Sequence, residues 1–186
     1  MHEAGGLFFY DKANFNGVMG GEGIQEASDL SVLASNYMDA QLTQIRGVTR
    51  SHPGLTGPRM EMVRYSLEKL TRETGITAVD VQNRMTDFGI DAFWLSHEPW
   101  LVPEPFTPEA GELWSKEDID EWIGVLRHVC AEAYSQPELV RSAPHSQVTR
   151  RVVGTRLDDP DYSATTWRAH RSKYGAGSRT GAREGA

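Results

Sequence analysis

The sequence predicts an α/β fold in which a small sheet is covered by helices. Two segments, around residues 22–46 and 116–133, carry apolar residues at three- and four-residue steps, which is typical of amphipathic helices. Short apolar runs at 7–10 and 92–95, each bounded by turn residues, are typical of strands. With 186 residues, 39% of them hydrophobic, the chain is long enough for one domain with a real core.

Composition excludes several functional classes. A formal net charge of −7 argues against a nucleic-acid backbone or an anionic membrane as the main partner. No stretch has the apolar length of a transmembrane helix, and the N-terminus lacks a signal-peptide pattern. The single cysteine, Cys130, excludes an internal disulfide, so we expect a cytoplasmic protein. The six histidines have no metal-ligand spacing, and we expect no metal site.

The opening stretch carries the most informative carboxylate. Leu7 to Tyr10 is predicted as a buried strand, Asp11 follows its end, and Asn16-Gly17 is a turn signal. Ligands of open α/β sheets bind at strand ends, so Asp11 is placed to hold the protonated ring nitrogen of a pyridine cofactor. The alternative is that Asp11 caps a turn.

A long helix is expected from about Glu22 to Arg46, after Gly20-Gly21. Residues 47–58 are predicted as a loop and 59–67 as a half-buried strand. Arg59 and Arg64 on that strand either bind a substrate carboxylate or are solvated. The buried face of the helix is predicted to consist of Leu30, Leu33, Ala34, Tyr37, Met38, Gln41, Leu42 and Ile45.

A capping box at Thr77 and Asp80 predicts a helix that ends near Gly89 and buries Val81, Met85 and Phe88. The strand at 92–95 leads into residues 97–108, where four prolines exclude a helix or a central strand. This loop, which contains His97, is interpreted either as an active-site wall or as a stiff segment packed on its neighbours.

The last helices begin at a capping box of Ser115 and Asp118 and at Pro137. Cys130 lies on the apolar stripe of the first and is interpreted as a small buried hydrophobe. Residues 160–186 are polar and rich in Gly, Ala and Arg, so we expect a disordered tail. The stripe comprises Ile119, Trp122, Ile123, Leu126, Val129, Cys130 and Ala133.

Several of these segments, in this order, resemble the glycine cleavage system P-protein, a pyridoxal-phosphate (PLP) glycine decarboxylase. The similar segments lie within residues 3–17, 22–40, 75–89, 104–117 and 137–158, so the resemblance covers roughly residues 2–159. Each motif is modest, and their order along the chain is specific. Bacterial versions split this glycine dehydrogenase into two subunits, and the chain is similar to the C-terminal part of the second.

The resemblance implies PLP fold type I. Residues 1–21 would be a remnant of the large domain, 22–159 the small C-terminal α/β domain, and 160–186 the tail. Asp11 matches the family's partner of the cofactor ring nitrogen, and Asn14 and His97 are further candidates for the cofactor pocket. The implied reaction is glycine decarboxylation on PLP, with the aminomethyl group passed to a lipoyl carrier protein, in an oligomeric enzyme.

One departure limits what this chain does alone. The family segment that carries the Schiff-base lysine is missing between the opening stretch and the helix at Glu22. None of the four lysines, Lys12, Lys69, Lys116 and Lys173, matches its position, so no catalytic residue is assigned. We therefore expect activity to need a first-subunit-like partner chain. The alternatives are a non-catalytic binding or regulatory module of a PLP enzyme complex, or a decayed fragment.

Overall fold

The computed structural model describes residues 12–60, 62–91, 93–96, 100–111, 113–151, 167 and 171; for residues 12–19 it describes the backbone alone. The chain divides into two units, Met1–Val148 and Thr149–Ala186, and the fold below is that of the first. Its described part is mixed α/β with a small antiparallel sheet, which confirms the fold class in this coarser form. The strand predicted at 7–10 and the tail at 160–186 lie outside the described residues, apart from Trp167 and Arg171.

Helix α1 (Lys12–Leu42) is two helical segments joined at Gly20, whose φ of 70° and ψ of 174° are not helical. Glycine adopts positive φ without a Cβ clash, so the chain bends there. The helix predicted from Glu22 is confirmed, although it ends at Leu42 and not at Arg46. The turn predicted at Asn16-Gly17 is wrong, because helix continues through both residues and the positive φ falls at Gly20.

Three two-residue strands form the sheet, in the order β1-β2-β3 and antiparallel throughout. They are β1 (Thr49–Arg50), β2 (Tyr65–Ser66) and β3 (Pro105–Phe106). Leu95 adds a single antiparallel bridge to Phe106, so the strand predicted at 92–95 is reduced to this bridge in the described residues. Phe106 thus pairs with a neighbour on each side. The prediction that prolines exclude a central strand from 97–108 is therefore wrong for this residue. The strand forms because Pro105 is its first residue, where the missing N–H is tolerated.

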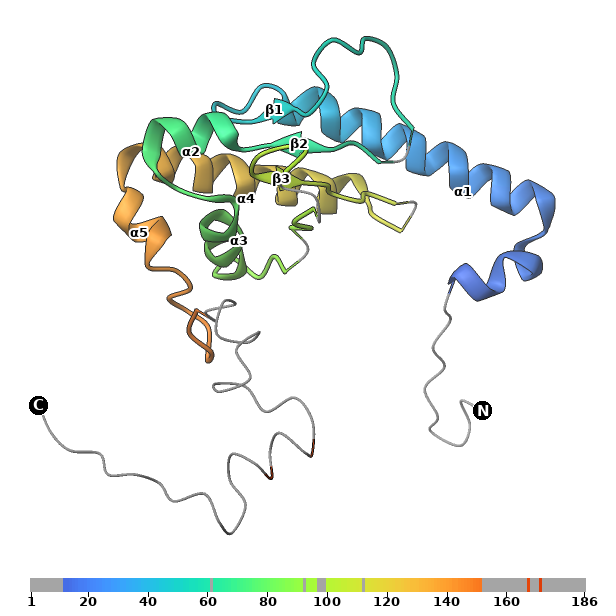
Figure 1. Cartoon of the computed structure of the whole chain (residues 1–186). Helices are drawn as coiled ribbons and strands as arrows, with labels where there is room; N and C mark the ends of the chain where they lie inside the picture. The colour runs from blue at the N-terminus through green and yellow to red at the C-terminus, as the bar shows by residue number, and fades with distance from the viewer. Residues whose placement is uncertain are drawn as a thin grey trace, which may run out of the picture. The chain divides into compact units, whose positions relative to one another are not determined.

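Helix α4 (Lys116–Ser135) is the centre of the helical layer and contacts α1, α2, α3 and α5 (Figure 1). Its capping box at Ser115 and Asp118 is present, and its whole predicted stripe is buried. Stacked rings connect it to the sheet: Tyr65 on β2 packs on Phe106, which packs on Phe93, which packs on Trp122 of α4. The core therefore lies between α4 and the sheet.

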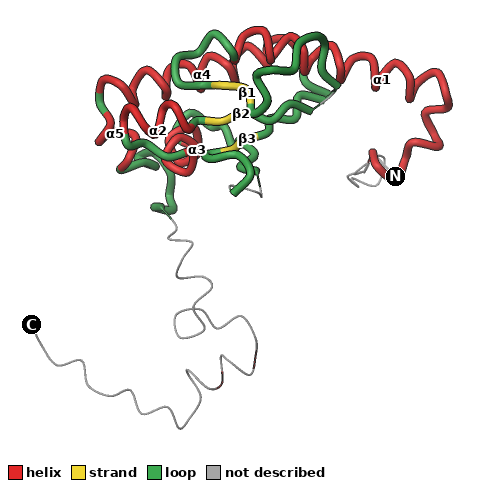
Figure 2. Tube along the Cα trace, turned by 45° about the horizontal axis from the view of Figure 1, so that its top comes forward, coloured by secondary structure: helices red, strands yellow, loops and turns green. Residues whose placement is uncertain are grey.

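The remaining helices contact α4, and Figure 2 shows them gathered to one side of the sheet. They are α2 (Glu68–Thr74), α3 (Ala78–Thr86) and α5 (Pro137–Arg141). The Thr77–Asp80 capping box and the start at Pro137 are confirmed. Helix α2 was not predicted, because only Leu70 among its seven residues is buried and its other positions carry no apolar period. Phe88 is exposed and not buried as predicted, since α3 has already ended at Thr86.

Candidate functional site

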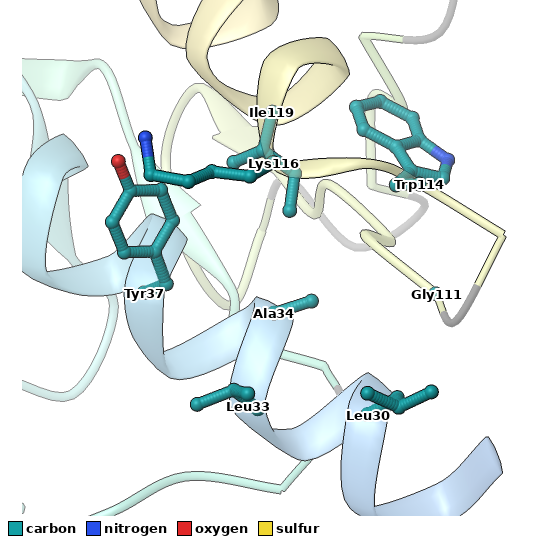
Figure 3. Close-up of a pocket in the computed structure, with 8 residues that line it drawn as sticks. All are labelled: Leu30, Leu33, Ala34, Tyr37, Gly111, Trp114, Lys116 and Ile119. Atoms are coloured by element: carbon teal, nitrogen blue, oxygen red, sulfur yellow. The ribbon is translucent and has the colours of Figure 1, made fainter.

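An apolar groove lies between the middle of α1 and the start of α4 (Figure 3). Its volume is about 310 Å³. Leu30 and Leu33, which α1 presents to it, are 45% and 66% exposed, although the helical period predicted them to be buried. The groove, called the α1 groove below, is lined by Leu30, Leu33, Ala34, Tyr37, Gly111, Trp114, Lys116 and Ile119.

A polar triad lies at one side of the α1 groove. The Tyr37 hydroxyl donates to Asp120 Oδ1 at 2.5 Å, the Lys116 ammonium pairs with Asp120 Oδ2, and the ammonium lies 5.2 Å from the Tyr37 ring centroid. Asp120 and then Tyr37 raise the pKa of Lys116 by stabilising its charged form. An imine-forming lysine needs a neutral amine, so this environment opposes Schiff-base chemistry at Lys116.

None of the predicted cofactor residues can be placed at this groove. Asp11 and His97 lie outside the described residues, and of Asn14 only the backbone, within α1, is described. Lys69 is exposed on α2, the Lys12 side chain is not described, and Lys173 lies outside the described part. The side chains that the structure does describe therefore do not form a site that fits PLP, and the assignment of Asp11, Asn14 and His97 stays a prediction.

An ion pair between a buried carboxylate and a partly buried arginine connects α1 to the sheet. Arg50 on β1 donates from Nε to Asp39 Oδ1 at 2.9 Å and from Nη2 to Oδ2, and the Tyr65 hydroxyl donates to Oδ1 at 3.0 Å. Burial and then Asp39 raise the pKa of Tyr65, so the phenol stays neutral. Asp39 is not among the residues of the predicted buried face of α1, yet it is buried. It is buried because Arg50 and Tyr65 cover its carboxylate, and these partners lie 11 and 26 residues away in the chain, so no local sequence signal revealed them.

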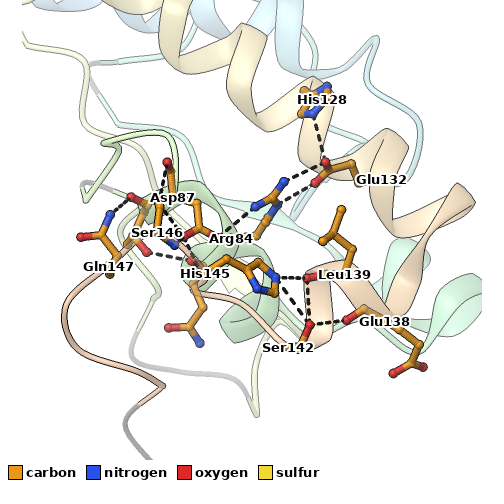
Figure 4. Close-up of polar contacts among 12 residues, drawn as sticks. Arg84, Asp87, His128, Glu132, Glu138, Leu139, Ser142, His145, Ser146 and Gln147 are labelled. Carbon is orange, nitrogen blue, oxygen red and sulfur yellow. Dashed lines mark hydrogen bonds and ion pairs between the residues drawn. The ribbon is translucent and has the colours of Figure 1, made fainter.

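A second polar cluster joins α3, α4 and the segment after α5 (Figure 4). Arg84 donates to both Glu132 oxygens, at 2.8 and 2.9 Å, and to Asp87 Oδ2 at 3.0 Å. Asp87 Oδ1 accepts from the backbone N–H groups of His145 and Ser146 at 2.6 and 2.7 Å. These charges satisfy one another, so the cluster is a structural connection, and sequence reasoning missed it because its members are far apart in the chain.

The described residues contain neither a metal-ligand cluster nor a reactive thiol. Among the side chains that the structure describes, no group of three or more His, Cys, Asp or Glu residues could hold a metal ion. Cys130 is buried in α4, and burial raises the pKa of its thiol to about 12, which confirms it as a small buried hydrophobe in place of a nucleophile. Within the described helices, none is long and apolar enough to cross a membrane.

Comparison with known proteins gives a consistent relationship. The chain is 39% identical over 135 residues to the probable glycine dehydrogenase (decarboxylating) subunit 2 of Thermococcus onnurineus. It is 38% identical over 157 residues to that of Thermococcus kodakarensis and 34% identical over 134 residues to that of Thermosipho africanus. These matches cover 73%, 83% and 72% of this chain. No family model matches.

The predicted resemblance to the second subunit of glycine dehydrogenase is therefore confirmed. The matches cover only 26%, 30% and 27% of the three relatives, so the chain spans between a quarter and a third of their length. Most of what such a subunit contains is thus outside the aligned segment.

Proposed function

We propose that this chain acts as part of a PLP-dependent glycine dehydrogenase (decarboxylating), completed by a partner chain that supplies the imine-forming lysine. The single observation that carries the proposal is identity of 38–40% to such subunits over most of this chain, with only 26–30% of their length represented. A reaction that needs the residues of a whole subunit would then require residues from another chain. PLP would supply the electron sink for decarboxylation.

The lysine environment supports the need for a partner. Lys116 is paired with Asp120 and its pKa is raised, and Lys69 is exposed on α2. Lys116 therefore lacks the charge-depleted surroundings that lower a lysine pKa for imine formation, and Lys69 is not buried. By resemblance, Asp11 would hold the cofactor ring nitrogen, with Asn14 and His97 nearby, and the aminomethyl group would pass to a lipoyl carrier protein in the cytoplasm. The fold would be the small domain of PLP fold type I.

The α1 groove supports the same proposal on physical grounds. The exposed side chains of Leu30 and Leu33 line the groove together with Trp114, so apolar surface is exposed to solvent when the chain is alone. Covering such area contributes about 25 cal/mol per Å². The polypeptide that we propose to cover it is the partner that carries the missing part of the subunit.

The experiment is cofactor trapping in two samples. The purified chain is mixed with PLP, either alone or with a first-subunit-like chain that carries a candidate lysine, then reduced with borohydride and mapped by mass spectrometry. We expect a stoichiometric adduct on the partner lysine and glycine-dependent CO₂ release in the mixture only. A stoichiometric adduct on Lys12, Lys69, Lys116 or Lys173 in the first sample would show that the chain needs no partner lysine.

A matched pair of variants tests Asp11 in the active mixture. Asp11→Ala should abolish cofactor-dependent activity, because the ring nitrogen loses its carboxylate. Asp29→Ala removes the same charge from an exposed position on α1 and should leave activity unchanged. Full activity of the Asp11→Ala mixture would contradict the assignment.

The competing function is a non-catalytic binding or regulatory module of a PLP enzyme complex. The same observation of Lys116 and Lys69 favours it, since neither environment suits an imine. It predicts that the chain binds a complete PLP enzyme and changes the activity of that enzyme. It also predicts that mixing the chain with a first-subunit-like chain produces no additional PLP–lysine adduct. A decayed fragment would do neither.

A further inference from the structure

A second recess, separate from the α1 groove, lies beside β1 and the loop that follows it. Its volume is about 200 Å³, smaller than the roughly 300–1,000 Å³ of sites for drug-sized ligands. Arg50, Ser51, His52, Leu55, Arg59 and Arg64 contribute to its lining. Three of these carry a guanidinium, in a chain whose formal net charge is −7. We call this recess the arginine pocket.

Arg59 is held in the pocket wall by its own backbone. Asn36 on α1 accepts from the Arg59 N–H at 2.7 Å and donates to the Arg59 carbonyl at 2.7 Å. The same amide donates to the Val32 carbonyl at 2.7 Å, so its orientation is fixed. This two-point contact fixes Arg59 relative to α1.

The guanidinium of Arg59 is incompletely satisfied. Nη2 donates to the Leu55 carbonyl, while Nε is buried and has no hydrogen-bond partner among the described atoms. A buried donor without a partner is destabilising, and such groups are rare in folded proteins. No ion pair of the described chain includes Arg59.

The carboxylate that pairs with Arg50 has no free oxygen for Arg59. Both Asp39 oxygens accept from Arg50, and Oδ1 also accepts from Tyr65, so Asp39 neutralises the neighbouring Arg50 and not Arg59. His52 is oriented by Ser51, whose Oγ lies 2.8 Å from its Nδ1. The pocket therefore combines a guanidinium that forms no ion pair with any described residue, a buried N–H without a hydrogen-bond partner and a rigid frame.

We propose that the arginine pocket binds a small oxyanion, a carboxylate or a phosphate group, with the Arg59 guanidinium as its main ligand. The planar fork of a guanidinium matches two oxygens of such a group, and charge-assisted bonds are the strong ones. Arg50, held by its ion pair with Asp39, shapes the pocket wall. The inference does not depend on the proposed function, because it concerns binding by this chain alone.

The test is a titration of the full-length chain, followed by ¹⁵N NMR, with inorganic phosphate and separately with sodium acetate, each against sodium chloride at the same ionic strength. We expect saturable shifts at residues 36, 50–60 and 62–64. A tighter constant for phosphate would identify a phosphate group as the ligand, and a tighter constant for acetate a carboxylate. Shifts that match those in chloride for both anions would overturn the proposal.

Three variants assign the binding. Arg59→Gln should weaken the tighter anion at least tenfold, and Arg59→Lys, which keeps the charge and loses the fork, should weaken it less. Arg72→Gln removes a guanidinium that is exposed on α2 beside Glu68 and should leave affinity unchanged. Equal affinity in wild type and Arg59→Gln would overturn the assignment to Arg59. If Arg59→Gln fails to fold, the wild-type titration and the Arg59→Lys variant still decide the outcome.

Discussion

Helices α1 and α4 carry similar apolar stripes, and the protein buries them very differently. Every stripe residue of α4 from Ile119 to Ala133 is buried. On α1 the stripe is buried only in its C-terminal half, where Met38 is 2% exposed, while Leu33 is 66% exposed. Figure 1 shows the reason, because the N-terminal half of α1 extends past the sheet and past α4.

This difference separates two kinds of information in a helical period. The period predicts which face of a helix is apolar, since that depends on spacing alone. It does not predict which residues cover that face, because the covering residues come from other segments or from another chain. In α4 the covering elements are in this chain, and for the N-terminal half of α1 we propose that they are in a partner.

The largest expected effect is at the centre of the α4 stripe. Trp122 is 1% exposed and stacks on Phe93, so Trp122→Ala should lower the free energy of unfolding by about 3–5 kcal/mol. Urea denaturation followed by circular dichroism measures this. Trp100→Ala, at a side chain that is 76% exposed, is the matched control and should change stability by less than about 0.5 kcal/mol. Similar losses for both would show that the α4 stripe is not the core.

The next effect concerns the charges that fix α3 to α4. Arg84 is 13% exposed and bridges Glu132 and Asp87, so Arg84→Met leaves two partly buried carboxylates without their partner. We expect the free energy of unfolding to fall by about 2–3 kcal/mol. This is less than the loss for a fully buried ion pair, because water reaches these side chains. Arg72→Met, which breaks one exposed pair with Glu68, should cost less than about 0.5 kcal/mol in the same denaturation series.

The same cluster gives stability a pH dependence. Arg84 holds the pKa of Glu132 below its ordinary value, and, against the opposing effect of burial, the backbone N–H groups of Ser146 and His145 hold that of Asp87 low. A carboxyl whose pKa is lower in the folded state stabilises above its unfolded pKa, near 4, and this contribution is lost as pH falls through the folded value. Unfolding free energy should therefore fall below about pH 4. Asp87→Asn should flatten that fall, and an unchanged pH profile in this variant would contradict the assignment.

Local signals predicted local structure well. Both capping boxes, the α4 stripe and the start of α5 at Pro137 follow from spacing within one turn of helix, and all are present. The contacts that hold the elements together were not predictable, because they join residues far apart in the chain. Asn36 with Arg59 and Arg84 with Glu132 are of this kind.

The candidate site was predicted from resemblance and stays a prediction for the same physical reason. Asp11 and His97 lie outside the described residues, and a cofactor pocket depends on how distant segments meet. The arginine pocket shows the same limit, because the sequence left two interpretations of Arg59 and Arg64: binding of a substrate carboxylate, or solvation at the surface. Only the structure shows that Asp39 neutralises Arg50 and leaves Arg59 without an ion pair among the described residues.

A smaller effect is expected where a loop caps a helix. Glu104 accepts from the Ala78 N–H at the start of α3 at 2.5 Å, and its carbonyl accepts from Leu67 at 2.9 Å. Its negative charge also suits the positive end of the helix dipole. Glu104→Gln keeps the shape and removes the charge, and should lower unfolding free energy by about 0.5–1 kcal/mol. Glu109→Gln, at an exposed acid just after β3, is the control for the urea measurement and should have no effect.

The smallest effect on the free chain is expected at the groove, and it is the most direct test of the comparison. Leu33→Asp puts a charge at a position that is 66% exposed, so the unfolding free energy of the isolated chain should change by less than about 0.5 kcal/mol. If the α1 groove binds the partner chain, the same substitution buries an unpaired charge in the complex and should weaken association at least tenfold by isothermal titration. Leu55→Asp, at a leucine of similar exposure outside the groove, should leave association unchanged. Equal affinity for wild type and Leu33→Asp would mean that the exposed half of α1 is not where the partner binds, and that α1 and α4 differ for a reason unrelated to assembly.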